Sequence, residues 1–481
     1  IQHRRVFCGH ALRMMPSRRK LRCFLLLHAL LLGCLVLGPQ AWLGATHHTT
    51  TGTCRSGKGL QRVVRDSKRL DSELWPEMFD WVKSTGLDTS DIQVKVAATE
   101  DLAKGELGLV TTAPLVAGDI LAWAPTSLLL NKDKAVDLWG ALVEDLSDRL
   151  ALILLLVQER FLHGTASKWH VYMQRLPDFN GDVSGPSFLW SEEEISLLQG
   201  SDGYGAALAM YNTIVDEYEW LNENLFLKHP DTFPAETFSF KNYLWAAANV
   251  ASRAYGDDPS GTHLCIAPLV DFLNHKAGAL QLTRFGNGIV AYAHKNYEAG
   301  EQVWVSYGGK SNAEILSQYG FVDPDNSQEA VYIRVGEHLP VKSNAQLELI
   351  SQLLEDQDPA TAIFRISRKP REWEPKLMPV LRILAKKDDL PQDAEEMIPR
   401  QEPELEASAY ELLQQGLKTR ENEYPFSLEE DKKQLDKLEK DPPADAIGDR
   451  LTLALKLRIS EQELLELVMA YAGDQALRAK A

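Results

Sequence analysis

The arrangement of hydrophobic and polar positions predicts a β region that is interrupted by a block of helices. Short alternating or apolar segments typical of strands lie at residues 92–96, 107–110 and 119–123, and strands resume at 270, 289–293 and 303–306. Apolar residues recur at helical spacing over three longer segments, 146–161, 206–226 and 240–254, and an amphipathic helix over 75–85 precedes the first strand. The pattern predicts an α+β fold over residues 73–322, with the helical insertion at about 140–250.

The remaining residues, 323–481, carry only helical patterns and are rich in Glu and Lys. Ser427-x-x-Glu430 and Ser460-x-x-Glu463 match the capping box, in which a serine and a glutamate three residues later satisfy the first backbone N–H groups of a helix. We therefore expect helices to begin at both serines, within an all-α C-terminal domain.

Charge is distributed unevenly along the chain. Residues 1–70 contain thirteen Lys/Arg and one acid, Asp66, for a sum of +12; the other 411 residues contain 38 Lys/Arg and 67 Asp/Glu, for −29. Such an acidic body disfavours nucleic acid as a partner, because binding phosphates requires a basic face. It suits a protein partner that carries a lysine. Cys265 is the only cysteine after residue 54, so the body has neither an internal disulfide nor a thiolate zinc site, and we expect no metal.

The first 72 residues have the composition of a targeting signal. Basic residues at 18–22 precede an apolar run over 24–37, which is short for a membrane span and typical of a signal peptide. Small residues near 41–45 suit cleavage, and 46–72 is basic and Thr/Ser-rich, like a transit peptide. We expect a bipartite signal, 1–45 and 46–72, that directs the chain to a plastid. The alternative is an uncleaved signal anchor, which would place the body at a membrane.

Two segments concentrate polar groups at the ends of buried elements. The apolar run Pro268-Leu269-Val270 leads into Asp271-Phe272-Leu273-Asn274-His275, and about thirty residues later Gly300-Glu301-Gln302-Val303-Trp304-Val305-Ser306 ends in Tyr307 before two glycines. Buried polar groups that lack partners cost free energy, so such groups usually bind something.

Together with further blocks, these segments resemble the SET-domain methyltransferases, in the branch of the Rubisco large-subunit lysine methyltransferases. The further blocks are Gly105-Glu106-Leu107-Gly108, Ser167-Lys168-Trp169 with Leu176-Pro177, Ser252-Arg253-Ala254-Tyr255, and Gln318-Tyr319-Gly320-Phe321. The resemblance covers roughly residues 75–475 and implies a SET domain with a helical insertion, followed by a helical domain that grips the target protein.

The resemblance implies a protein methyltransferase that uses S-adenosylmethionine. Tyr307 then takes the place of the catalytic tyrosine and also contacts the substrate. Tyr319 lines the lysine channel, although an aromatic residue before Gly-Phe would equally suit the core. Asp271 is either a pocket carboxylate on the substrate side or the cap of a local turn.

The expected cofactor contacts come from three places in the chain. Glu106, Leu107 and Gly108 resemble the first cofactor loop, where glycine permits close approach of the backbone. Arg253 matches the family arginine at the cofactor carboxylate, and we also expect it to contact the substrate. Asn274 and His275 would hold the cofactor, and His275 could instead be a structural hydrogen-bonding residue.

Three departures from the family pattern concern residues near this site. Asp257 stands where a second basic residue is common, Lys276 stands where serine is common, and the segment after Tyr307 is one residue shorter than in the Rubisco enzyme. Tyr255 favours lysine as the target, because the relative that modifies histidine in actin has an amide there. Histidine methylation and a non-catalytic SET-like binding protein remain the alternatives.

Overall fold

The computed structural model describes residues 74–84, 94–98, 107–179, 185–256, 263–286, 288–354, 357–386, 390–443 and 445–481. The predicted targeting segments, 1–45 and 46–72, lie outside the described residues, as do Glu106 and Asp257. Within the described part of the chain, no helix combines the length and apolar character that crossing a membrane requires.

The β region consists of several small sheets. Strands β1 (Val94–Ala98) and β2 (Leu107–Thr111) pair antiparallel, and β9 (Gly288–Tyr292) lies between β3 (Ile120–Pro125) and β8 (Thr283–Phe285). A third sheet has β6 (Leu264–Ile266) between β4 (Leu130–Asn131) and β5 (Tyr255–Gly256), and a fourth pairs β7 (Asn274–His275) with β10 (Trp304–Val305). These short strands confirm the predicted irregular β structure.

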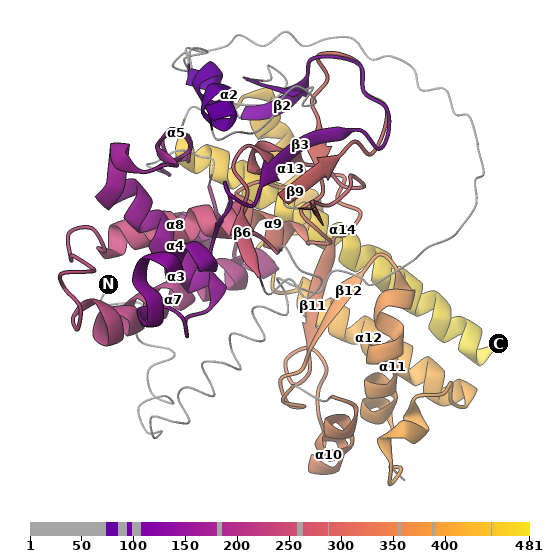
Figure 1. Cartoon of the computed structure of the whole chain (residues 1–481). Helices are drawn as coiled ribbons and strands as arrows, with labels where there is room; N and C mark the ends of the chain where they lie inside the picture. The colour runs from indigo at the N-terminus through magenta and orange to yellow at the C-terminus, as the bar shows by residue number, and fades with distance from the viewer. Residues whose placement is uncertain are drawn as a thin grey trace.

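A block of helices lies between β4 and β5, as the hydrophobic spacing predicts. Helix α2 (Leu74–Ser84) precedes the first strand, and α9 (Asn312–Tyr319) follows the last strand of the SET region. The helices of the block are α3 (Lys132–Trp139), α4 (Asp148–Val157), α5 (His170–Met173), α6 (Glu192–Ser196), α7 (Asp202–Leu221) and α8 (Phe240–Arg253). Figure 1 shows α3, α4, α7 and α8 gathered on one side of the small sheets. Two π-helical segments, η4 (Gln158–His163) and η7 (Asn222–Phe226), extend α4 and α7.

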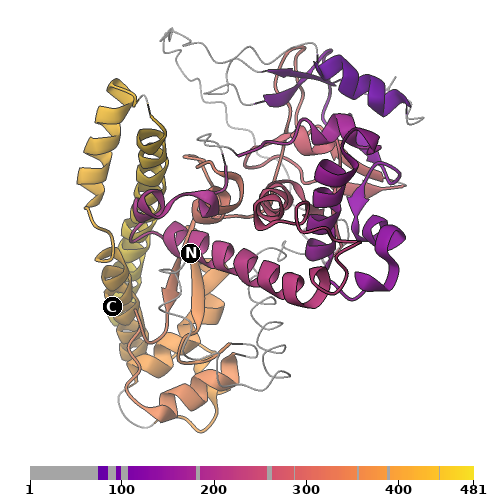
Figure 2. The same cartoon turned by 90° about the vertical axis from the view of Figure 1, so that its left-hand side faces the viewer.

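The C-terminal region is mainly helical and has a hydrophobic core of its own. Its helices are α10 (Asn344–Leu353), α11 (Pro370–Ala385), α12 (Pro403–Glu421), α13 (Leu428–Lys440) and α14 (Ala446–Lys480). It also contains an antiparallel pair of strands, β11 (Ala330–Arg334) and β12 (Ile363–Ser367), which the hydrophobic pattern did not predict. The long helix α14 runs beside both α12 and α13 (Figure 2).

Two expectations about local structure were wrong. Ser427 begins α13 with the predicted capping box, but Ser460 lies inside the continuous helix α14. The Ser460 hydroxyl is instead a buried partner of Glu329 and of the Asn312 amide, so a tertiary contact uses the group that a cap would use. Residue 270 starts a 3₁₀ turn, η8 (Val270–Phe272), rather than a strand.

A smaller apolar cluster joins the SET region to the C-terminal region. It brings together side chains of the insertion, of α9 and of α14, namely Trp190, Ile195, Leu198, Ala207, Ala313, Leu316, Ala454 and Leu457. The SET region, with the largest core cluster, and the helical C-terminal region are therefore packed against each other through α14.

Candidate active site

A short parallel ladder brings the two predicted segments together. Trp304 pairs with Asn274 and Val305 with His275, and the Lys276 backbone N–H donates to the Val305 carbonyl at 2.9 Å. The ladder is only two residues long, but it fixes the register of two segments that lie about thirty residues apart in the sequence.

Tyr307, directly after this ladder, reaches back over the first segment. Its hydroxyl donates to the Leu273 carbonyl at 2.9 Å, and its backbone N–H donates to Nδ1 of His275 at 3.0 Å. Its ring stacks on Tyr319 with 4.6 Å between centroids and 29° between planes. The structure therefore places Tyr307, Tyr319, His275 and the residue before Asn274 in one cluster.

His275 holds the backbone of Tyr307 and does so as a neutral imidazole. Because Nδ1 accepts the Tyr307 N–H, the ring proton lies on Nε2. Burial lowers the pKa of His275, which favours the same uncharged form. The hydrogen-bonding role that the sequence left open is the one that the structure shows for this side chain.

Gly108 lies against the Asn274 amide. A Cβ atom at Gly108 would stand 2.8 Å from Nδ2 of Asn274 and 2.4 Å from Nε2 of Gln302, so a larger residue there would displace both amides. Val303 N donates to the Leu109 carbonyl at 2.9 Å, which ties β2 to the segment that ends in Tyr307. Leu107 is the first residue of β2.

Arg253 and Asp271 form a buried ion pair beside this cluster. Nη1 of Arg253 lies 3.1 Å from Oδ2 of Asp271 and 3.3 Å from its carbonyl oxygen, and the Asp271 side chain is 3% exposed. Burial raises the pKa of Asp271, although the positive charge of Arg253 acts to lower it. Burial acts to lower the pKa of Arg253, but the negative charge of Asp271 outweighs this effect, so the pKa of Arg253 is raised. Asp271 is thus a buried carboxylate that bonds an arginine.

Tyr172 also belongs to this group, and the sequence analysis missed it. Its hydroxyl donates to Oδ2 of Asp271 at 2.6 Å, and burial followed by the charge of Asp271 raises the pKa of the phenol well above its usual value. The residue lies inside the block that begins at Ser167-Lys168-Trp169, but a tyrosine on a short helix carries no signal of a partner 99 residues away.

Several buried polar atoms around the cluster have no hydrogen-bond partner among the described residues. They are Nε of Arg253, Oδ1 of Asp271 and Nε2 of Gln302. Unpaired buried groups are rare in folded proteins because each costs about 1–3 kcal/mol. A guanidinium and an amide with unused donors suit a ligand that carries a carboxylate and other acceptors.

Leu269 adds backbone strain next to the same residues. It has φ of 78°, a left-handed value that non-glycine residues rarely adopt, and it immediately precedes η8. Such strain is concentrated at functional sites.

Tyr255 and Lys276, which the sequence singles out near the site, take defined positions. The Tyr255 hydroxyl donates to the Leu282 carbonyl from β5, two residues after Arg253. Lys276 is exposed, and its ammonium lies 5.5 Å from the centroid of the Trp304 ring. Its charge is therefore on the surface beside the ladder.

Comparison with known proteins shows similarity over most of the described chain. Residues 342–465 match a family model described as Rubisco LSMT substrate-binding. The chain is 25% identical over 437 residues to the actin-histidine N-methyltransferase of Mus musculus, covering 85% of this chain and 69% of that protein. It is 27% identical over 266 residues to the chloroplastic ribulose-1,5 bisphosphate carboxylase/oxygenase large subunit N-methyltransferase of Pisum sativum, covering 52% of each.

Solved structures show the same fold. A crystal structure of the SET domain of LSMT bound to lysine and AdoHcy superposes with a TM-score of 0.70 at 22% identity, covering 85% of this chain and 93% of that one. A structure of Rubisco LSMT bound to AdoMet gives 0.68 at 24% identity, with 84% and 93% covered. These likenesses confirm the SET-type α+β fold with its helical C-terminal region. The family model over residues 342–465 and the relative from Pisum sativum confirm the resemblance to the Rubisco methyltransferase-like branch.

Proposed function

We propose that this protein is an S-adenosylmethionine-dependent protein methyltransferase that modifies a lysine of a protein substrate. The observation that carries the proposal is the contact of Tyr307 with the Leu273 carbonyl, which places a phenol beside the Asn274–His275 segment. A decayed site would have no reason to keep this contact together with the pair of Arg253 and Asp271.

The cofactor supplies an electrophilic methyl group on its sulfonium, and the residues present fit it. The unpaired Nε of Arg253 would take its carboxylate, and Gln302 and Asn274 would hold its polar groups next to Gly108, where a larger residue would displace both amides. The solved neighbours carry AdoMet or AdoHcy, which supports this choice of ligand.

The chain's own residues would prepare the amine for transfer. A lysine side chain has a pKa of about 10.4 and must be neutral to attack, and removal from water favours the neutral form. Since Tyr307 donates its hydroxyl proton to Leu273, its oxygen is oriented as an acceptor that can align an incoming N–H. The stacked rings of Tyr307 and Tyr319 would limit the approach angle, and positioning of this kind accounts for much of the acceleration in such reactions.

Lysine is preferred to histidine because of Tyr255. An aromatic residue at position 255 suits an aliphatic amine. It has no amide that could bond an imidazole, and its hydroxyl already donates to the Leu282 carbonyl. Histidine is the second candidate, because a relative that aligns over 437 residues is an actin-histidine N-methyltransferase.

Labelled methyl transfer tests the activity and identifies the target. The purified chain is incubated with a plastid extract and labelled S-adenosylmethionine, and the labelled protein is analysed by mass spectrometry. A modified lysine is expected. A modified histidine would establish the second candidate, and the absence of any labelled protein would favour a non-catalytic binding protein.

Tyr307→Phe tests the role of the phenol. We expect transfer to fall by roughly 100-fold or more, as for the loss of one oriented hydrogen-bonding group at a reaction centre, while cofactor affinity is retained. Tyr218→Phe is the matched control, because its hydroxyl bonds the Phe238 carbonyl in the helical block and lies outside the candidate site. Unchanged turnover in Tyr307→Phe would remove the residue from its role.

We further propose that residues 1–72 direct the protein to a plastid, in keeping with their composition and with a chloroplastic relative. A fluorescent protein fused behind these residues should accumulate inside the organelle. Retention of the fusion at a membrane would support the signal-anchor alternative.

A further inference from the structure

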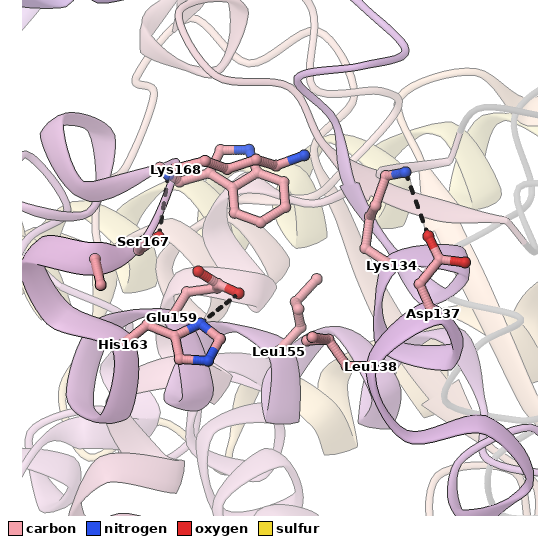
Figure 3. Close-up of a pocket in the computed structure, with 10 residues that line it drawn as sticks. Lys134, Asp137, Leu138, Leu155, Glu159, His163, Ser167 and Lys168 are labelled. Atoms are coloured by element: carbon pink, nitrogen blue, oxygen red, sulfur yellow. Dashed lines mark hydrogen bonds and ion pairs between the residues drawn. The ribbon is translucent and has the colours of Figure 1, made fainter.

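A cavity with charged groups on an otherwise largely apolar lining lies in the helical block, and none of its lining residues takes part in the methyl-transfer site. It has a volume of about 280 Å³ and lies between α3, the end of α4 with η4, and the segment that leads into α5 (Figure 3). This is close to the lower end of the range for small-molecule sites, roughly 300–1,000 Å³. Its size therefore suits a small ligand rather than a segment of a protein.

Lys168, on one wall, lacks a direct counter-charge. Its ammonium lies 4.0 Å from the centroid of the Trp169 ring and 3.4 Å from the Ser127 carbonyl, and it makes no ion pair within 4.0 Å with any acid of the described residues. Burial lowers the pKa of Lys168, and the neighbouring charge of Lys134 lowers it further. An anionic group at this position would stabilise the ammonium.

Glu159 provides the opposite charge from the other wall. Its side chain is 5% exposed, and one carboxylate oxygen lies 3.2 Å from Nδ1 of His163 within the π-helical segment η4. π-Helical segments occur frequently at functional sites. In Figure 3 the Glu159 carboxylate points up from the helix toward the side of the cavity on which Lys168 lies. Glu159 and Lys168 influence each other electrostatically, but they do not touch.

The remaining wall combines apolar surface with a second cation. Leu155 and Leu138 line the cavity, and Leu138 is 45% exposed. Lys134 also lines it, and its nearest acid is Asp137, at 3.5 Å, which is itself largely exposed. Such an exposed pair holds its lysine weakly, so Lys134 can also turn to a ligand.

We infer that this cavity binds a small zwitterion of the α-amino acid type, with its ammonium at Glu159, its carboxylate at Lys168 and Lys134, and an apolar side chain against Leu138 and Leu155. A simple anion would meet the buried Glu159 carboxylate, and a simple cation would meet two lysines. Only a ligand with both charges pairs each wall, and this assignment is independent of the proposed methyl transfer.

Calorimetric titration with L-leucine and two singly charged analogues tests the assignment on the full chain. L-leucine methyl ester keeps the ammonium, and 4-methylpentanoate keeps the carboxylate. We expect saturable one-to-one binding of leucine, and binding at least about tenfold weaker for each analogue. Leucine that binds no more tightly than the analogues, or no binding of leucine, methionine or phenylalanine at millimolar concentration, would overturn the assignment.

Substitutions on each wall should respond to a different analogue. Lys168→Met should weaken leucine about tenfold without weakening the methyl ester, whereas Glu159→Gln should weaken leucine without weakening 4-methylpentanoate. Lys228→Met is the control, because the ammonium of this exposed lysine bonds Asn224 and lies outside the cavity. Because Glu159 is buried, thermal melting checks whether Glu159→Gln folds. If Glu159→Gln does not fold, leucine binding by Lys168→Met tests the site. Unaltered leucine affinity in Lys168→Met would refute the site, whether or not the protein transfers methyl groups.

Discussion

Two buried arginine–aspartate pairs in this protein differ in how completely they are bonded. Arg458 of α14 gives two nitrogens to the two oxygens of Asp431, at 2.9 and 2.7 Å, and its third to the Leu197 carbonyl at 2.7 Å. Asp431 accepts a further bond from Gln462. Arg253 bonds Asp271 through one nitrogen only, and each partner keeps a buried atom without a hydrogen bond among the described residues.

The difference separates a pair that holds the fold from a pair that can hold a ligand. Arg458 connects α13, α14 and the insertion, and every polar atom of the pair is used in doing so. Arg253 interacts electrostatically with Tyr307, and the unused atoms of its pair are those that the proposed cofactor would satisfy. Unpaired buried nitrogens also occur at Arg149 and Arg420, so at Arg253 the incomplete bonding indicates a candidate site only together with the neighbouring cluster of Tyr307, Asn274 and Gly108.

Breaking the saturated pair should have the largest effect on stability. Arg458→Met leaves Asp431 buried without its partner, so the free energy of unfolding should fall by about 3–5 kcal/mol. Urea unfolding measures the loss. A loss below about 1 kcal/mol would show that complete bonding does not distinguish this pair.

Breaking the incomplete pair should act chiefly on cofactor use. In Arg253→Met the KM for S-adenosylmethionine should rise about tenfold or more, because a hydrogen bond to a charged group contributes about 1.5–3 kcal/mol. Burial already favours the protonated form of Asp271, so this variant should lose less stability than Arg458→Met. Steady-state kinetics and urea unfolding of both variants give the comparison, and an unchanged KM would contradict the assignment of Arg253.

Removing the third member of the incomplete group should have a smaller effect. Tyr172→Phe deletes the bond to Asp271 while Arg253 still holds the same oxygen, so we expect a stability loss of about 1 kcal/mol. The KM for the cofactor should rise only a few-fold, with kcat less affected. A loss of kcat at constant KM would place Tyr172 in the reaction itself rather than in positioning Arg253.

The smallest effect concerns pH. Because burial lowers the pKa of His275, the folded form prefers the neutral imidazole, and its contribution to stability is present above the unfolded value of about 6.5. That contribution is lost as the pH falls through the folded-state pKa. An NMR titration of the imidazole should give a midpoint below 6.5, and His275→Gln should reduce the loss of stability in this range. A midpoint above 6.5 would contradict the neutral form.

Local patterns in the sequence predicted those parts of the site that depend on short segments. Tyr307 and Asn274 end apolar segments, and Gly108 lies at the beginning of a strand, so each carries a signal within a few residues. The fold class was predicted from the change between strand and helix periodicity along the chain. Each periodicity extends over many residues, so a single residue that departs from it does not change the prediction.

The parts that were missed depend on contacts between distant segments. Tyr172 acquires its role only when α5 packs beside η8, and Ser460 has the local signature of a cap but meets Glu329 instead. The pairing of β11 with β12 joins residues about thirty apart, with a helix between them. No window of a few residues contains that information.

Calorimetric titration of S-adenosylmethionine into the purified chain tests the assignment of the cofactor site most directly. Saturable binding of one molecule per chain, displaced by S-adenosylhomocysteine and weakened by Arg253→Met, is expected. No heat of binding to the folded wild-type protein would contradict the proposed methyltransferase.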